Sequence, residues 1–273
     1  MKACLLQTMY SATDPAFQAE GFAREIAMLD SLDDQMIDII VIPEYAESLF
    51  APRTHEEFRD QIEKYAPIIE QKAREAAIRC HAIVFANFGY KTERGYRNTT
   101  HVFGRDGNIV GRYFKQHPAP SEIKNPYIDT DYAESDLPVT IVEVEGIRYA
   151  FRTCYDFYFY EDLVNIARAR PDIIIGCSHQ RTDTHEALAL MNRFHSYQAN
   201  AYLLRASVSL GEGSAVCGCT CAIAPDGTML GDMKNDVGIL TVEFDPTAKY
   251  YKAAGFGGKP KAHFEYVDEG RRR

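Results

Sequence analysis

The sequence predicts a layered α/β fold, and two patterns along the chain carry that prediction. Short apolar runs of strand length alternate with longer segments whose apolar residues recur at helical spacing. No Ser/Gly/Pro-rich linker divides the 273 residues into two halves, so a single domain over residues 1–273 is the simpler interpretation. Strands mixed with covering helices pack as layers around a shared core, which is the α/β class.

The first half of the chain begins with two strand-helix units. We expect strands at 2–9 and 37–43 and helices at 15–32 and 55–80. Pro67 lies inside the second helix and predicts a kink there. Three further strands are expected at 82–90, 98–104 and 109–115. The Arg-Asp-Gly-Asn sequence at 105–108 supplies a hairpin turn between the last two.

The second half returns to alternation after an irregular, Pro-containing stretch at 118–138. It predicts strands at 139–144, 147–153, 173–177 and 202–208, and helices at 161–169 and 186–199. The remainder is expected to be β-structure, with strands at 215–224, 228–232 and 238–244.

Composition and charge exclude several functional classes. The chain has 39 acidic against 30 basic residues, a formal charge of −9, which argues against a general binder of nucleic acid. Hydrophobic residues make up 46 % and charged residues 25 %, as in ordinary globular proteins. No apolar run approaches the roughly 20 residues of a membrane-spanning helix. We therefore expect neither nucleic acid nor a membrane as a partner, and we interpret the basic end of the chain, from about residue 259, as a solvated tail or an oligomer contact.

The seven cysteines indicate a reducing compartment. Their number is odd, and the N-terminal segment MKACLLQTM alternates like a strand rather than resembling a secretory signal. Reduced thiols in the cytoplasm therefore fit better than a disulfide framework. One of these thiols is a candidate for chemistry.

Three reactive side chains stand at predicted strand ends, where open α/β folds place their ligands. Glu44 follows the apolar run IIVIP, Lys115 ends the run IVGRYFK, and Cys154 ends IRYAFRTC. A thiol at a strand-to-helix turn lies beside backbone N–H groups, which favour thiolate and can hold a developing oxyanion. Singly, each residue has an ordinary explanation as a helix-start acid, a surface charge or a small buried hydrophobe. Together they indicate a catalytic group.

In order and spacing, these residues and their neighbours resemble the nitrilase, or carbon-nitrogen hydrolase, superfamily. The resemblance rests on PEY at 43–45, RYFKQH at 112–117 and CYDFYFYE at 154–161, and continues through 191–204 and 218–231. It covers nearly the whole chain, to about residue 244. No single tripeptide is specific, but the ordered set is.

The resemblance implies a four-layer α-β-β-α sandwich and a Glu-Lys-Cys triad, here Glu44, Lys115 and Cys154. The thiolate attacks the carbon of an amide, carbamoyl or nitrile group, and the ammonium and the N–H of Tyr155 stabilise the charge that develops. The Glu carboxylate transfers protons in both half-reactions. A second Glu near the Lys is typical of the family. Glu122 is the first candidate, and Glu134 is the alternative.

The implied function is a cofactor-free thiol hydrolase that releases ammonia from a small carboxamide or N-carbamoyl compound, as a homodimer or larger homo-oligomer. The residues expected to contact substrate are Tyr155, Tyr158, Ser178, His179 and Gln180. The sequence departs from the family pattern at several positions. These departures weaken any inference of the substrate from the family more than they weaken the assignment of the triad. Tyr158 and Tyr160 replace the usual Arg and Pro, Gln198 replaces a Glu, and Arg152 replaces an apolar residue.

Other interpretations stay open. Cys177 also ends an apolar strand and has His179 two residues later, although a buried Cys and a pocket-rim His is the preferred interpretation. Cys217, Cys219 and Cys221 share a strand face at a spacing of roughly 6.5 to 7 Å, too wide for zinc, so no metal is expected. A non-catalytic binding or assembly protein, an acyltransferase and a true nitrilase remain alternatives.

Overall fold

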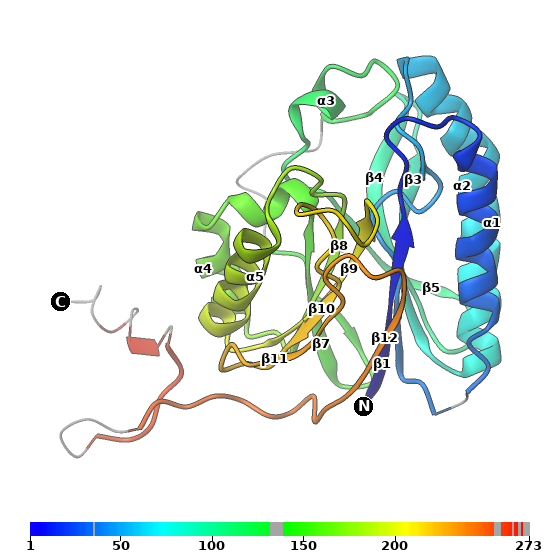
Figure 1. Cartoon of the computed structure of the whole chain (residues 1–273). Helices are drawn as coiled ribbons and strands as arrows, with labels where there is room; N and C mark the ends of the chain where they lie inside the picture. Colours follow the sequence, from blue (N-terminus) through cyan, green and yellow to red (C-terminus); the bar gives the residue numbers. More distant parts are fainter. Residues whose placement is uncertain (35, 132–138, 254–257, 264, 267–268, 270–273) are drawn as a thin grey trace.

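The computed structural model describes residues 1–34, 36–131, 139–253, 258–263, 265–266 and 269 (Figure 1). The helices are α1 (Phe17–Asp30), α2 (His55–Cys80), α3 (Pro120–Ile123), the 3-10 helix η1 (Cys154–Tyr158), α4 (Glu161–Ala169) and α5 (His185–Ala199). The strands are β1 (Lys2–Met9), β2 (Ile39–Val41), β3 (Ile83–Lys91), β4 (Tyr96–Phe103), β5 (Ile109–Phe114), β6 (Val142–Val144), β7 (Ile147–Thr153), β8 (Ile173–Ser178), β9 (Tyr202–Ser209), β10 (Cys221–Ile223), β11 (Met229–Asp232) and β12 (Gly238–Glu243).

The strands form one continuous sheet in the order β5-β4-β3-β2-β1-β9-β8-β7-β6. Pairing is parallel from β3 through β2, β1, β9 and β8 to β7, and antiparallel at both flanks. β12 pairs with β1, and β10 pairs with β9 and β11. The carboxyl ends of the parallel strands therefore lie along one edge, where an α/β fold places its ligands.

The sheet folds back on itself, so that its two halves face each other. Successive strand residues point to opposite faces: Ile39 and Val41 of β2 lie in a core between the halves, together with Phe151 of β7. Across this core the rings of Phe85 and Tyr149 stand 4.9 Å apart.

Two further cores cover the outer faces. Ile40 packs with the apolar faces of α1 and α2, and Ile174 with α4 and α5. Figure 1 shows the α1/α2 pair on one side of the strands and the α4/α5 pair on the other. Helix, sheet, sheet and helix make four layers, and the predicted α-β-β-α sandwich is confirmed.

Four elements have the bounds predicted from the sequence, namely β1, α2, β7 and α4. α2 includes Pro67 and is capped by Thr54, whose side chain accepts the Glu57 N–H. The strand predicted over 37–43 is shorter than expected, since only Ile39–Val41 is in the sheet. The irregular stretch after β5 contains the short helix α3, and residues 132–138 lie outside the described part of the chain.

The long strand predicted over 215–224 is wrong, because only Cys221–Ile223 is extended. Cys217, Gly218 and Cys219 have φ of 72°, 68° and 65°, in the left-handed region that ends a strand. A Cβ at Gly218 would stand 1.9 Å from the carbonyl oxygen of Lys234, so the close packing of this turn requires glycine. The three cysteines therefore do not share a strand face.

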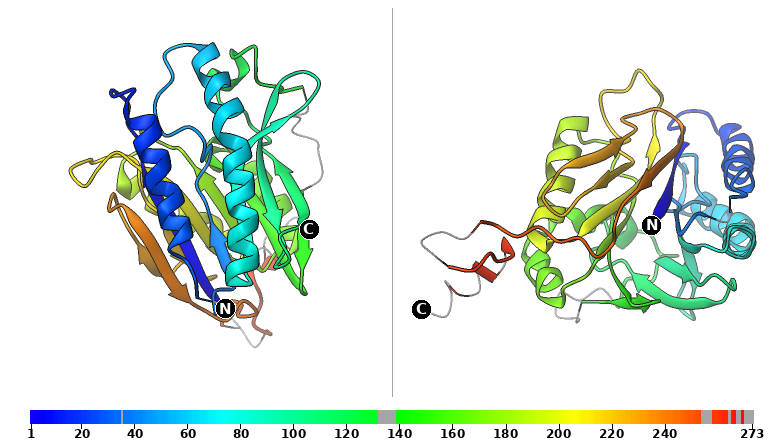
Figure 2. Two further views of the ribbon diagram at one scale, coloured as in Figure 1. Left: turned by 90° about the vertical axis from the view of Figure 1, so that its right-hand side faces the viewer. Right: turned by 90° about the horizontal axis from the view of Figure 1, so that it is seen from below.

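Among the described residues, no helix is both long and apolar enough to cross a bilayer. After β12, residues 245–253 run along and then away from the layered body (Figure 2). Of the predicted basic tail, Lys259 and Lys261 are described, and Arg271, Arg272 and Arg273 lie outside the described residues.

Candidate active site

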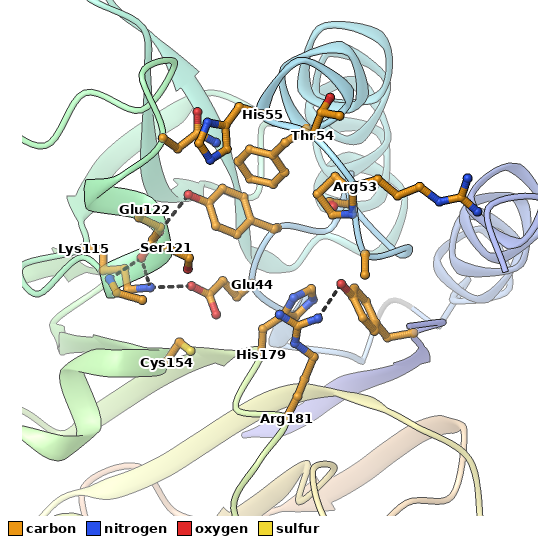
Figure 3. A pocket seen from close by; sticks show the side chains of 18 residues that line it. Glu44, Arg53, Thr54, His55, Lys115, Ser121, Glu122, Cys154, His179 and Arg181 are labelled. Atoms are coloured by element: carbon orange, nitrogen blue, oxygen red, sulfur yellow. Dashed lines mark hydrogen bonds and ion pairs between the residues drawn. The ribbon is translucent and has the colours of Figure 1, made fainter. Parts of the chain in front are cut away.

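Glu44, Lys115 and Cys154 come together at one edge of the sheet. Glu44 follows β2 and Cys154 follows β7, two strands of the parallel core. β5 runs antiparallel to β4, which runs antiparallel to β3, so Lys115 leaves β5 at the same edge. All three side chains line a single cavity of about 420 Å³ (Figure 3).

Lys115 bridges two carboxylates. Its Nζ lies 2.9 Å from Oε1 of Glu44 and 2.6 Å from Oε2 of Glu122, and all three side chains are buried. Burial alone lowers the pKa of Lys115, but the charges of Glu122 and Glu44 outweigh it and hold that pKa well above its ordinary value. The ammonium therefore stays charged and acts through its field.

The two carboxylates have different hydrogen-bond environments. Glu122 accepts from Tyr45 Oη at 2.8 Å, Asn98 Nδ2 at 2.8 Å and the Ala119 N–H at 2.6 Å, in addition to Lys115. Glu44 receives Lys115 and Asn98 on Oε1 only.

The second oxygen of Glu44, Oε2, is buried and has no hydrogen-bond partner among the described residues. A buried carboxylate oxygen without a donor is costly, and such atoms persist where a function uses them. Glu44 can accept a proton on Oε2, whereas Glu122 is committed to fixing the ammonium.

Cys154 is held as a neutral thiol. Burial, and then the negative charge of Glu44, raise its pKa, and the opposing effect of Lys115 is smaller. A thiol in this state needs a base at the moment of attack. Glu44 lines the same cavity as Cys154, and its Oε2 is available to accept a proton (Figure 3).

The turn that carries Cys154 is tightly fixed. Cys154 has φ of 48°, a left-handed conformation that costs energy for a non-glycine residue and that concentrates at functional sites. Asp156 holds the turn, since its carboxylate accepts the Thr153 N–H at 2.8 Å, the His117 N–H at 2.8 Å and the Tyr113 hydroxyl at 2.7 Å. Tyr45, directly after Glu44, is also left-handed, with φ of 46°.

The residues predicted to contact substrate divide into two groups. His179 lines the cavity, and its Nε2 is buried without a partner in the described part of the chain. Burial, followed by the charges of Arg181 and Lys115, lowers the pKa of His179 well below its ordinary value, so the ring is neutral.

The other four predicted residues do not line this cavity. Ser178 Oγ and Gln180 Oε1 both accept from the buried guanidinium of Arg205. The Tyr155 ring packs edge-on against Tyr158, whose hydroxyl donates to Asp183. Their roles as substrate contacts stay predictions.

Cys177 has the environment of a core residue. It is 1 % exposed and packs in the core between the two halves of the sheet, and burial raises the pKa of its thiol to about 12. It is absent from the cavity wall that holds Cys154. Glu134, the alternative second carboxylate, lies outside the described residues.

Four residues of the site were missed from the sequence. Asn98 and Tyr45 hold the carboxylates. Arg181 lines the cavity on the side away from Lys115 (Figure 3), and it donates to the hydroxyl of Tyr10, which lines the same cavity. In the sequence, Tyr45 stands out only as part of the PEY motif, and Asn98 only as the first residue of a predicted strand. An Asn at the start of a strand carries no signal of its own, because its role depends on which strands become neighbours.

A model of the carbon-nitrogen hydrolase family matches residues 8–252. Similar solved structures include an amidase from Nesterenkonia sp. (16 % identity, TM-score 0.71, covering 100 % of this chain and 95 % of that one). Nit3 of Saccharomyces cerevisiae, a member of branch 10 of the nitrilase superfamily, shares 19 % identity at a TM-score of 0.70 over 90 % of each chain. XC1258 of Xanthomonas campestris, a CN-hydrolase superfamily protein, shares 19 % at 0.66 over 89 % of each.

At these identities the solved structures establish the fold, which is that of nitrilase-superfamily enzymes. The family model spans most of the sequence, from within β1 to beyond β12. The chain therefore belongs to the carbon-nitrogen hydrolase family.

Proposed function

We propose that this protein hydrolyses the C–N bond of a small carboxamide or N-carbamoyl compound through a thioester on Cys154, and releases ammonia. The observation that carries the proposal is the unpartnered Oε2 of Glu44 in the same cavity as the Cys154 thiol, beside a permanently charged Lys115. A base without a partner, a neutral thiol and a fixed cation are what nucleophilic attack on an amide requires.

The reaction has two half-reactions. In the first, Cys154 Sγ forms a bond to the carbonyl carbon as its proton passes to Glu44, and the C–N bond breaks as Glu44 returns that proton to the leaving amine. In the second, water gives a proton to Glu44 while its oxygen attacks the thioester. The C–S bond then breaks, and the proton returns to sulfur.

Lys115 stabilises the charge that develops on the substrate oxygen, and the second donor is the backbone N–H of Tyr155, whose ring packs outside the cavity lining against Tyr158. The charges of Glu122 and Glu44 hold the pKa of Lys115 well above its ordinary value, which favours an electrostatic role over proton transfer. Tyr155 is the second residue of η1, so its N–H is one of the donors that a helix start leaves without an intrahelical partner. A variant of the Nesterenkonia amidase carries acrylamide at its active-site cysteine. Thiol reactivity on a similar fold supports the assignment.

The opposite side of the cavity favours a substrate with an acidic group. Arg181 lines this side, with Nη1 donating to Tyr10 Oη at 2.5 Å, and has no carboxylate partner among the described residues. The cavity's two carboxylates, Glu44 and Glu122, are both paired with Lys115. A guanidinium matches a carboxylate with two parallel hydrogen bonds, so amides of dicarboxylic acids and ureido acids are the substrates we favour.

A panel of substrates tests the proposal. Ammonia release is followed with neutral amides, monoamides of dicarboxylic acids, ureido acids and nitriles, using the full chain and its Cys154→Ala and Cys177→Ala variants. Turnover that is lost in Cys154→Ala and kept in Cys177→Ala supports the proposal. Turnover lost only in Cys177→Ala moves the nucleophile to that residue. If no substrate of the panel releases ammonia and Cys154 gains no mass from an acyl group, the alternative of a binding or assembly protein is favoured.

Acyl transfer and nitrile hydrolysis use the same thiol. An amine that intercepts the thioester reveals the first, and turnover restricted to nitriles reveals the second. A cytoplasmic location and a homodimer or larger assembly stay predictions. Exposed apolar side chains near and on α4 and α5 give such an assembly a surface: Tyr160, Leu190 and Phe194.

A further inference from the structure

A second group of reactive side chains lies outside the catalytic cavity. His185 is the first residue of α5, Asp232 ends β11, and Cys219 belongs to the left-handed turn before β10. One donor atom from each lies within 4.8 Å of the others. We propose that these three residues bind one zinc-class divalent metal ion that stabilises this part of the fold.

The donor types match such an ion. A sulfur, an imidazole nitrogen and a carboxylate oxygen are ligands that Zn²⁺ takes in tetrahedral sites. A regular strand would keep the cysteines too far apart to share a metal ion. Cys217 to Cys219 instead form a left-handed turn, which brings the Cys219 sulfur close to His185 and Asp232.

The two sulfurs are set up as a pair. The amide Nδ2 of the fully buried Asn192 lies 3.5 Å from Cys219 Sγ and 3.6 Å from Cys221 Sγ, and donates to both. Both thiols are buried as well. An N–H group that faces the Cys219 sulfur stabilises its thiolate, which is the form that binds metal.

The nitrogen and oxygen donors have capacity left over. His185 Nε2 lies 2.7 Å from Asp232 Oδ2, while His185 Nδ1 is buried without a partner among the described residues. A metal at tetrahedral geometry needs the nitrogen and oxygen to be about 3.4 Å apart. Binding therefore exchanges one hydrogen bond for two metal bonds after a small opening, and it releases the Cys219 thiol proton.

The site would act at a distance from the chemistry. The carbonyl oxygens of Gly218 and Cys219 accept from Arg205 Nη1 at 2.9 and 2.6 Å. The other guanidinium nitrogen of Arg205 holds Ser178 and Gln180, which flank the cavity residue His179. A metal that fixes Cys219 therefore stabilises the α5, β10 and β11 junction and, through Arg205, the segment beside the cavity. Its expected signature is thermal stability, with the amidase chemistry unchanged.

The test uses the full chain with Cys154→Ala, so that the catalytic thiol contributes no binding. After treatment with EDTA and a non-thiol reductant, the protein is titrated with Co²⁺ and then Zn²⁺. We expect one equivalent of Co²⁺ to give sulfur-to-metal charge-transfer absorption, which Zn²⁺ abolishes, and we expect the melting temperature to rise on loading. Cys219→Ser and Asp232→Asn should each weaken binding at least tenfold. Cys217→Ser, a matched change in the same turn, should not.

Circular dichroism spectra of the metal-free proteins check that the variants fold. Absence of stoichiometric binding overturns the proposal, and so does equal binding by Cys219→Ser, Asp232→Asn and the parent, which marks an adventitious ion only. Binding that is lost in the Cys217→Ser control but kept in Cys219→Ser places the ion elsewhere and overturns it too.

Discussion

The ammonium nitrogen of Lys115 lies 2.9 Å from Oε1 of Glu44, although 71 residues separate them in the chain. A second carboxylate, Glu122, holds the same nitrogen from the other side at 2.6 Å. The cation is thereby fixed, and one oxygen of Glu44 is left without a partner. The two buried carboxylates therefore differ: Glu122 fixes the ammonium, and Glu44 keeps an oxygen that can accept a proton.

Lys115→Met should remove both activity and stability. The variant leaves two buried carboxylates without their cation, and breaking a buried ion pair in this way costs on the order of 3 to 5 kcal/mol. Urea unfolding measures the loss. Lys91→Met, at a lysine whose side chain is 72 % exposed, should shift the unfolding free energy by less than about 1 kcal/mol. Equal losses in the two variants would show that the pairing at Lys115 is not stabilising.

Glu44→Gln should abolish turnover while the fold persists. The amide keeps an oxygen for Lys115 and Asn98 but cannot take the thiol proton, so kcat should fall on the order of 10³-fold. Glu47→Gln, three residues further along the same loop, is the matched control and should keep its activity. If Glu44→Gln retains a tenth or more of the rate, Glu44 is not the base.

Arg181→Gln should separate acidic from neutral substrates. The KM for the monoamide of a dicarboxylic acid should rise on the order of tenfold, because a charge-assisted contact is lost, while the KM for a neutral amide of equal length stays constant. The pair of substrates controls for any change in the cavity. A parallel rise for both would assign Arg181 to packing, without affecting the proposed hydrolysis itself.

Glu47 should make stability depend on pH. Burial raises the pKa of its carboxyl from 4.5 to about 7, so between these values the folded protein holds a proton that the unfolded chain has released. The stability due to this proton is complete below pH 4.5 and is lost as pH rises through about 7. Glu47→Gln keeps an acceptor for the Gly89 N–H and removes this dependence.

Unfolding of the two proteins in urea measures the effect. The variant should match the parent near pH 4.5 and exceed it by up to about 3 kcal/mol at pH 8, following from a shift of about 2.5 units at 1.36 kcal/mol each. A difference that does not change with pH would mean that Glu47 titrates normally in the folded protein.

The sequence predicts the regular parts of the fold because their signals are local. α2 and β7 have the predicted bounds, since apolar residues at helical spacing define the one, and an apolar run followed by a turn defines the other. The strand predicted at 215–224 fails because three consecutive left-handed residues interrupt an apolar, Cys-rich run whose side chains look strand-like. Nothing in the amino-acid composition of this segment indicates that Cys217 and Cys219 adopt a positive φ.

The site shows the same division. Glu44, Lys115, Glu122 and Cys154 follow from motif order and from strand ends, and the structure brings them to one cavity. Asn98, Tyr45 and Arg181 depend on which strands and loops become neighbours, which is a long-range property. The two chemical states that matter, a neutral thiol and a Glu44 oxygen without a donor, arise from burial and from the donors that happen to be near.

The most direct measurement of the central assignment is the mass of the acylated enzyme. The protein is mixed with a substrate that is turned over, quenched in acid, digested and mapped by mass spectrometry. The acyl group should be found on the peptide that contains Cys154 and be absent from Cys154→Ala. An acyl group on Cys177, or steady ammonia release by Cys154→Ala at the rate of the parent, would contradict the thiol mechanism proposed for Cys154.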